Sequence, residues 1–257
     1  MKTIKKISLA PIAAALMLVG VTAHAVPALQ LDIAGGTYDS DTQTIMATSN
    51  SFSVYAYGLS SGNGAVSLTL PYYLSIALVP GTVAPGSFGS FTVNNGTPIN
   101  ATSGLVYGTA PIENIPSLQG FDSGDLPKHD IFPTYFTEKQ FTFSSANKSG
   151  VYNTQDHAGW GPQAGTGMYY EKFDFDIAGL APGYGLHFDL YNETISVCGK
   201  AKNCTSGDLD VKNFAPFSHD AQGMVTTIPE PETYAMLLAG LGLMGFVATR
   251  RRQREVL

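Results

Sequence analysis

The chain has 257 residues with 14 basic and 20 acidic side chains, and these charges are unevenly distributed. Residues 26–229 contain seven lysines, no arginine and 17 carboxylates, a formal charge of −10, which repels phosphate backbones and excludes nucleic acid as a partner. Glycine and proline together stay below the level typical of low-complexity chains, so a folded domain is expected.

Residues 1–25 have the pattern of a secretory signal peptide. Lys2, Lys5 and Lys6 precede an apolar stretch, which is followed by Ala23 and Ala25 in an A-x-A cleavage site. The apolar stretch is shorter than the roughly 18 residues that a membrane span requires. We therefore expect export by the Sec machinery, cleavage by signal peptidase after Ala25, and a mature chain outside the cytoplasm.

Short segments in which apolar and polar residues alternate follow along the mature chain, and each predicts a β-strand. They lie at residues 29–33, 51–57, 65–70, 73–79, 90–93, 135–143, 169–177 and 186–192. Strands at this spacing with turn-rich connections predict an all-β domain at residues 26–227, folded as an antiparallel β-sandwich. The proline-dotted stretch at 97–133 lacks clean alternation, which predicts a long loop or a seam between two halves.

Two motifs look catalytic but lack the context that catalysis requires. The G-x-S-x-G around Ser60 leads into another alternating segment instead of a helix, which indicates a glycine-serine turn. Ser218, His219 and Asp220 are consecutive, whereas the members of a catalytic triad converge from separate elements. Whether other histidine and carboxylate neighbours converge, such as His187 with Asp189, stays open. We expect no enzymatic activity.

Calcium is the one cofactor that the sequence suggests, because a loop that offers two carboxylates is a start toward its oxygen ligands. Two Asp-x-Asp pairs in polar loops are the candidates: Asp39 with Asp41, and Asp208 with Asp210. A third pair, Asp174 with Asp176, fits the solvated face of a strand.

Cys198 and Cys204 are the only cysteines, and they bracket a short polar loop. In an exported protein such a pair favours a disulfide. Zinc is the alternative, and it would need two further ligands, which the sequence does not place at a recognised spacing.

Trp160 lies in a glycine-rich segment of a chain with 11% aromatic residues. Exposed aromatic rings can stack on sugar faces, so carbohydrate binding by the sandwich, with or without calcium, is an alternative function. Burial of these rings in the core is the structural explanation that competes with it.

Residues 228–253 combine a Pro-Glu-Pro turn, an apolar helix at 234–249 and the basic cluster Arg250, Arg251 and Arg252. The helix would be about 24 Å long, a marginal span for a bilayer whose hydrocarbon core is about 30 Å thick. The arginines would stay on the cytoplasmic side. A G-x-G-x-x-G pattern inside the helix has no strand before it and no βαβ unit around it, which argues against dinucleotide binding.

The order, spacing and terminal position of these features closely resemble the PEP-CTERM sorting signal of Gram-negative bacteria. The resemblance implies recognition of Pro229, Glu230 and Pro231 by exosortase, a membrane-embedded transpeptidase of bacteria that usually also make exopolysaccharide. The mature region is similar to choice-of-anchor N proteins in the segments at 29–39, 130–138, 179–192 and 214–222. That second resemblance implies an extracellular domain with no known enzymatic activity or ligand.

The sequence thus predicts a non-enzymatic exported protein that is held briefly in the inner membrane by its C-terminal helix. Exosortase would then process it, and it would reach the cell surface or an extracellular matrix. Exopolysaccharide is the expected partner there, in a biofilm.

Overall fold

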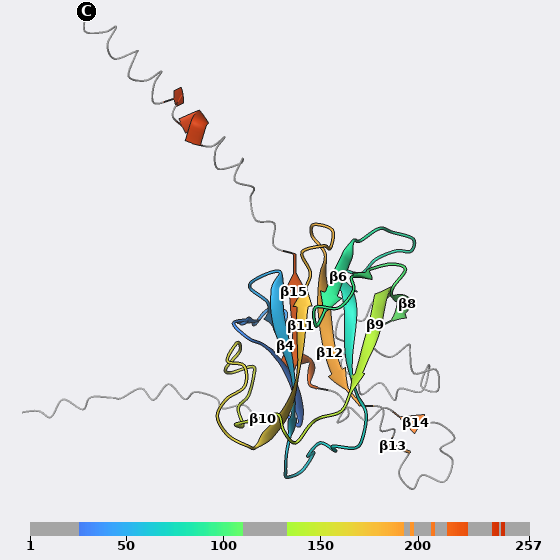
Figure 1. Ribbon diagram of the computed structural model, residues 1–257, viewed down its shortest axis with the longest axis vertical. Helices are drawn as coiled ribbons and strands as arrows, with labels where there is room; N and C mark the ends of the chain where they lie inside the picture. Colours follow the sequence, from blue (N-terminus) through green and yellow to red (C-terminus); the bar gives the residue numbers. More distant parts are fainter. Residues whose placement is uncertain are drawn as a thin grey trace, which may run out of the picture.

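The computed structural model describes residues 26–109, 133–192, 196–197, 207–208, 215–225, 238–241 and 243–244. In this part of the chain two β-sheets pack face to face, with the strand axes of one sheet roughly aligned with those of the other (Figure 1). The all-β prediction is confirmed.

The first sheet, sheet A, has six strands in the order β1-β4-β11-β6-β7, with β10 paired to β11. The strands are β1 (Leu29–Ile33), β4 (Ser51–Leu59), β6 (Ser90–Val93), β7 (Ile99–Asn100), β10 (Lys148–Ser149) and β11 (Met168–Asp176). Its long central pair is β4 with β11, antiparallel from Leu59 opposite Met168 to Ser51 opposite Asp176.

The second sheet, sheet B, has seven strands in the order β2-β3-β15-β12-β5-β9-β8. The strands are β2 (Thr37–Asp39), β3 (Thr44–Met46), β5 (Tyr72–Val79), β8 (Val106–Thr109), β9 (Pro133–Phe141), β12 (Gly185–Tyr191) and β15 (Asp220–Met224). All of its neighbours are antiparallel except β15 and β3, which run parallel. A two-stranded sheet of β13 (Ser196–Val197) and β14 (Gly207–Asp208) is described as well.

The core lies between the sheets and is rich in phenylalanine. Phe52 and Phe175 of sheet A stack at 5.8 Å, and both rings meet Phe188 of sheet B, at 6.0 and 4.6 Å. Aromatic pairs in such stacked and edge-on arrangements add to the stabilisation that burial of their area provides. The alternation of each strand therefore sends one set of side chains into this layer and leaves the other set on the two outer faces.

Most of the strands predicted from alternation are present, but the one predicted at 65–70 is wrong. In the structure this segment forms bends, and Leu68 and Leu70 are exposed at its end. The segment predicted as a long loop or seam, 97–133, contains β7 and β8. Six further short strands lie where no strand was expected: β2, β3, β10, β13, β14 and β15.

Candidate functional site

The outer face of sheet A, turned away from the core, carries a group of aromatic side chains. Tyr55 and Tyr57 of β4 stack with their ring centroids 6.1 Å apart, and Tyr170 of β11 lies 5.7 and 6.1 Å from them. Tyr57 also meets Tyr152 at 5.5 Å, and Tyr152 lies 5.8 Å from Trp160. These five residues, the aromatic row, come together because β4 pairs with β11 and a loop folds over the sheet edge.

The loop that carries Trp160 is held in place by a buried carboxylate, Asp32 of β1. Its oxygens accept hydrogen bonds from the backbone N–H groups of Gly159, at 2.8 Å, and Gly161, at 3.0 Å. A third hydrogen bond comes from the hydroxyl of Tyr152, at 2.9 Å. Burial raises the pKa of Asp32 above its ordinary value, and these three donors oppose that shift.

A second buried side chain of β1 holds the start of the same loop. The amide nitrogen of Gln30 donates to the carbonyl oxygen of Tyr152 at 2.7 Å, and its amide oxygen accepts from the backbone N–H of Thr154 at 3.1 Å. Gln30 is completely buried, so both ends of its amide are satisfied by the loop rather than by water. The loop is therefore fixed relative to the sheet at several points.

Trp160 presents its ring to solvent on this fixed loop. Its side chain is 53% exposed, and one face stacks on the imidazole of His157 with the centroids 4.0 Å apart and the planes 15° from parallel. Backing of this kind reduces the rotamer freedom that an exposed ring would lose on binding a ligand. Trp160 is thus a preorganised aromatic surface, as the alternative function requires.

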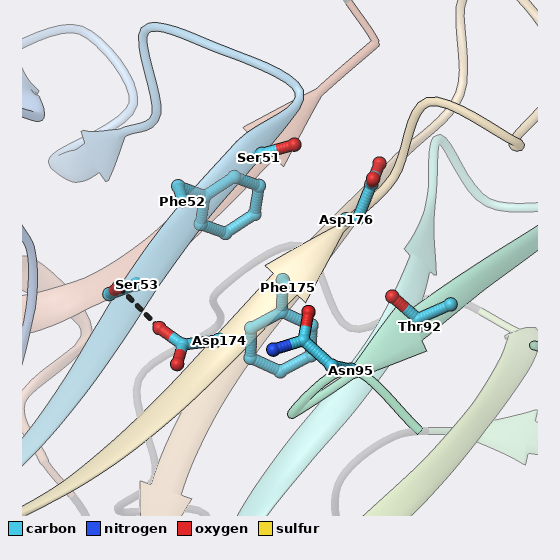
Figure 2. A pocket seen from close by; sticks show the side chains of 8 residues that line it. All are labelled: Ser51, Phe52, Ser53, Thr92, Asn95, Asp174, Phe175 and Asp176. Carbon is cyan, nitrogen blue, oxygen red and sulfur yellow. Dashed lines mark hydrogen bonds between the residues drawn. The ribbon is translucent and has the colours of Figure 1, made fainter. Parts of the chain in front are cut away.

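A hollow of about 300 Å³ lies on the same face of sheet A, further along β4 and β11. Figure 2 shows its polar side chains arranged around two core phenylalanines. The residues that line it are Ser51, Phe52, Ser53, Thr92, Asn95, Asp174, Phe175 and Asp176. Since Ser53 is two residues from Tyr55 on the same face of β4, the hollow continues the line of the aromatic row.

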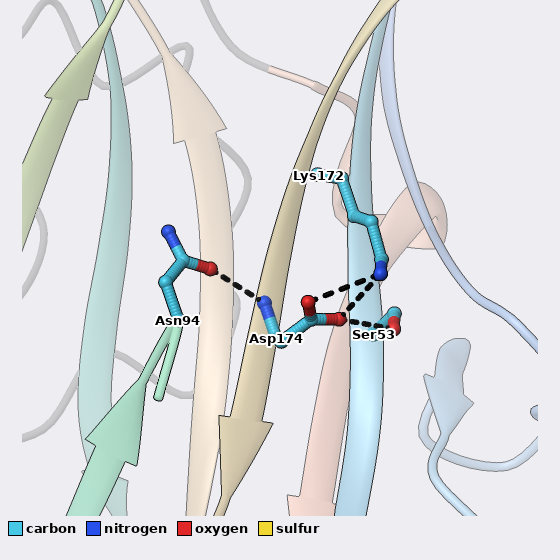
Figure 3. A network of polar contacts seen from close by, with 4 residues as sticks. All are labelled: Ser53, Asn94, Lys172 and Asp174. Atoms are coloured by element: carbon cyan, nitrogen blue, oxygen red, sulfur yellow. Dashed lines mark hydrogen bonds and ion pairs between the residues drawn. The ribbon is translucent and has the colours of Figure 1, made fainter. Parts of the chain in front are cut away.

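The wall of the hollow is held by a network centred on Asp174 (Figure 3). Its carboxylate accepts a hydrogen bond from the Ser53 hydroxyl at 2.6 Å and pairs with the Lys172 ammonium at 2.8 and 3.0 Å. Its backbone N–H donates to the side-chain oxygen of Asn94 at 2.8 Å. The hydrogen bonds from Lys172 and Ser53 lower the pKa of Asp174, so this carboxylate is charged at neutral pH.

Flat aromatic surface and a line of hydroxyl, amide and carboxylate groups therefore share one face. Such a surface suits a ligand with apolar C–H faces and many hydroxyl groups. Its carboxylates disfavour a polyanion.

A different cluster lies on the outer face of sheet B. The imidazole Nε2 of His187 is 3.6 Å from a carboxylate oxygen of Asp189 and 3.4 Å from one of Asp220. The two aspartates are 7% and 2% exposed. Burial alone would lower the pKa of His187, but the two carboxylates outweigh burial and raise it well above the ordinary value.

The structure describes three of the four predicted calcium residues. Asp39 ends β2, and its carboxylate accepts a hydrogen bond from the backbone N–H of Asp41 at 3.0 Å. This bond lowers the pKa of Asp39 and is typical of an aspartate that stabilises a turn. Asp208 lies on β14, and Asp210 is outside the described residues. Calcium binding by either pair stays a prediction.

The side chains of the two catalytic-looking motifs make hydrogen bonds with other parts of the domain. The Ser60 hydroxyl donates to the carbonyl oxygen of Thr166 at 2.9 Å. Ser218 Oγ lies 2.9 Å from Nδ1 of its neighbour His219, whose Nε2 contacts the side chain of Asn153 at 2.9 Å. Asp220 instead faces His187 from another strand, so the three consecutive residues do not form a triad.

Several predicted residues lie outside the described part of the chain. They are the cleavage-site residues Ala23 and Ala25, the cysteines Cys198 and Cys204, the Pro-Glu-Pro residues Pro229, Glu230 and Pro231, and the basic residues Arg250, Arg251 and Arg252. The roles of these residues stay predictions from the sequence.

The C-terminal apolar segment is described only at 238–241 and 243–244, and these residues are helical. Leu238, Leu241, Leu243 and Met244 are all more than half exposed. No helix in the described ranges has the length and apolar character that crossing a membrane would take. The transmembrane helix at 234–249 is therefore not supported by the structure.

Sequence reasoning singled out Trp160 but missed the tyrosines beside it. Alternation places Tyr55 and Tyr57 on one face of their strand, and this signal was present in the sequence. What the sequence does not contain is that β11 is the neighbour of β4, which brings Tyr170 to the same face. The convergence of Asp220 with His187 was missed for the same reason, because it depends on β15 lying beside β12.

Comparison with known proteins identifies one segment. Residues 227–252 match the family model described as the PEP-CTERM protein-sorting motif. No curated protein and no solved structure matches the chain. The resemblance of the tail is confirmed, whereas the similarity to choice-of-anchor N proteins stays a prediction.

Proposed function

We propose that this chain is a non-enzymatic exported protein that exosortase processes at its C-terminal segment and sorts to the cell surface or an extracellular matrix. The observation that carries the proposal is the match of residues 227–252 to the PEP-CTERM protein-sorting motif. The rest of the chain agrees with this, because an anionic β-sandwich follows a secretory signal pattern.

The residue types of the tail suit processing by a membrane enzyme. Proline at 229 and 231 restricts φ and favours an extended chain, which would make the motif accessible to an enzyme. The apolar residues and arginines that follow would hold it at the outer surface of the inner membrane for a short time, within reach of a membrane enzyme. Sec and signal peptidase would act before this step.

Intact mass of the extracellular protein tests the proposal. In a host that makes the matching exosortase, the wild-type chain should lose both the residues up to Ala25 and a C-terminal piece that begins near Pro229. A variant with Pro229, Glu230 and Pro231 all changed to alanine should keep its tail and stay with the membrane fraction. Pro182→Ala, at an exposed position, is the matched control and should be processed normally.

Deleting the exosortase should reproduce the behaviour of the triple variant. If wild-type protein outside the cell still ends at Leu257, processing does not occur and the proposal fails.

We propose a second function for the folded domain, binding of neutral polysaccharide on the outer face of sheet A. Three rings of the aromatic row support this, since Trp160 is exposed and Tyr55 and Tyr170 are partly exposed, while Tyr57 and Tyr152 are buried beside them. The hollow beside them offers hydrogen-bonding groups. The ring of Trp160 is exposed and already oriented. Exopolysaccharide of the producing cell or its biofilm is the expected ligand.

Affinity electrophoresis in gels that contain neutral polysaccharides tests this second function. We expect Trp160→Ala and Tyr55→Ala each to weaken binding by about fivefold, because stacking of one ring contributes about 1 kcal/mol. Tyr107→Ala is the matched control, since Tyr107 is a 40% exposed tyrosine on sheet B. Equal mobility of the wild type in gels with and without every polysaccharide would exclude the function.

A further inference from the structure

The outer face of sheet B carries a polar cluster that the sorting function does not use. On β12, Leu186, Phe188 and Leu190 are buried in the core between the sheets, so His187 and Asp189 face the opposite way. On β15, Ala221 belongs to the core and pairs with Phe188, which places Asp220 beside Asp189 on the outer face. Backbone pairing thus fixes the positions of three potential metal ligands.

The distances within the cluster are unusual for hydrogen-bonded partners. His187 Nε2 lies 3.4 Å from the oxygen of Asp220 and 3.6 Å from that of Asp189, whereas strong charge-assisted hydrogen bonds are about 2.7–2.9 Å long. Ligands that lie about 2.0–2.2 Å from a tetrahedral zinc ion are about 3.4 Å from one another. One ligand atom from each residue lies within 4.8 Å of the others. The two distances from Nε2 are therefore close to the spacing of ligands around a tetrahedral ion.

The second ring nitrogen of His187 supports the same conclusion. Nδ1 lies 3.3 Å from the side-chain oxygen of Gln222, an acceptor, so Nδ1 carries the proton in the neutral ring. In that tautomer Nε2 carries no hydrogen and can ligate an ion held between the two carboxylates, whereas without an ion the two carboxylates favour a second proton on the ring. Metal-binding histidines have this arrangement, in which an outer partner accepts the other N–H and fixes the ring.

A buried hydroxyl beside the cluster is an independent observation. Ser75 of β5 is directly opposite Asp189 in the pairing of β5 with β12, so the two side chains share the outer face. Ser75 is completely buried, and its Oγ has no hydrogen-bond partner in the described part of the chain. A water molecule on a metal ion in the cluster would supply the partner that this hydroxyl lacks.

We propose that His187, Asp189 and Asp220 bind one divalent transition-metal ion, with zinc as the best match. An imidazole nitrogen in the set favours zinc or a neighbouring transition metal over calcium and magnesium, which prefer oxygen ligands alone. Three protein ligands leave a fourth tetrahedral position for water beside Ser75. The ion would also neutralise two carboxylates that are almost completely buried.

Zinc titration of the full-length chain tests the site. Protein made without a histidine tag is stripped with a chelator and titrated with zinc chloride in a calorimeter. We expect one ion per chain, and at least tenfold weaker binding in His187→Gln and in Asp189→Asn. The matched controls His157→Gln and Asp176→Asn change the same residue types elsewhere and should bind like the wild type.

Two further measurements use the wild type alone, in case a variant does not fold. Zinc should raise the melting temperature of the stripped protein by several degrees, since a ligand that binds only the folded state stabilises it. X-ray absorption of the loaded protein should show nitrogen and oxygen ligands without sulfur. Absence of binding at micromolar zinc, undiminished binding in both variants, or sulfur ligands from the cysteines would each overturn the proposal.

Discussion

Asp32 shows how a single buried charge can organise a binding surface. It is completely buried, and three donors from the loop at 150–165 converge on its carboxylate. Transfer of a charged group from water into the protein interior is costly, and hydrogen bonds from fixed donors compensate for that cost. The same bonds orient the exposed Trp160, so stability of the loop and presentation of the ring depend on one residue.

Asp32→Asn tests this dependence. An asparagine has the same shape, but one carboxylate oxygen is replaced by an NH₂ group. This group donates hydrogen bonds and cannot accept one from the donors that now face the carboxylate. We expect the free energy of unfolding to fall by about 1–3 kcal/mol. Because Trp160 is the only tryptophan, its fluorescence should shift to the red and be quenched more easily. Asp41→Asn, on an exposed turn, is the control, and equal quenching of the two variants would contradict the expectation.

Asp174 gives a prediction about pH. Its pKa is lowered in the folded state, so its pair with Lys172 stabilises the fold above the ordinary aspartate pKa of about 3.9 and loses this effect as the pH falls through the lowered value. Both side chains are more than 40% exposed, so the contribution is below about 1 kcal/mol. Urea unfolding should find Asp174→Asn slightly less stable than the wild type at pH 7, and the difference should be smaller at pH 2. A difference that is the same at both pH values would contradict this.

At the level of elements, the pairing of β12 with β15 joins β2, β3 and β15 to the other strands of sheet B. The two strands lie so close together at Gly185 that a side chain does not fit there. A Cβ atom there would collide with the carbonyl oxygen of Gly223 and lie 2.6 Å from the sulfur of Met224. The close approach of the two backbones explains why glycine occupies this position.

Gly185→Ala should therefore destabilise the domain by about 1–3 kcal/mol, because the two strands must move apart. Chemical denaturation followed by circular dichroism measures this loss. Lys139→Ala, at an exposed position of β9, is the control and should change stability by less than about 0.5 kcal/mol. An alanine variant at 185 as stable as the wild type would show that the strands can separate at no cost.

The longer strands could be predicted from the sequence, and several of the short ones could not. Five or more residues of alternation, as in β4, β11 and β12, give a clear period-2 signal. Strands such as β2 and β3 have only three residues, which is too few to show a period. The alternating segment at 65–70 shows the opposite error, because alternation alone cannot say whether a partner strand is available.

At the scale of the whole molecule, both candidate ligand sites depend on which strands are neighbours. The aromatic row needs β4 beside β11, and the metal cluster needs β15 beside β12. Strand order in a sandwich is set by how the whole chain packs, and no local pattern contains it. The sorting tail is different, since its recognition lies within one short continuous segment, and for this reason the sequence alone identified it.

The same contrast predicts that tail and domain are separable. Every strand of the two sheets lies between Leu29 and Met224. A mature chain that ends at Val225 should therefore melt within about 2 °C of one that keeps the tail, and calorimetry of the two forms measures this. A markedly lower melting temperature would mean that the tail belongs to the fold.

The parallel pair of β3 and β15 sets the order in which an exported chain can finish folding. β3 ends at Met46, whereas β15 begins at Asp220, so a chain that emerges N-terminus first carries an unpaired strand edge until nearly all of it has crossed. Open edges of this kind invite aggregation. The pairing of β15 with β3 is therefore the step that joins β2 and β3 to the rest of sheet B, and until it forms, the edge of β3 is open to other chains.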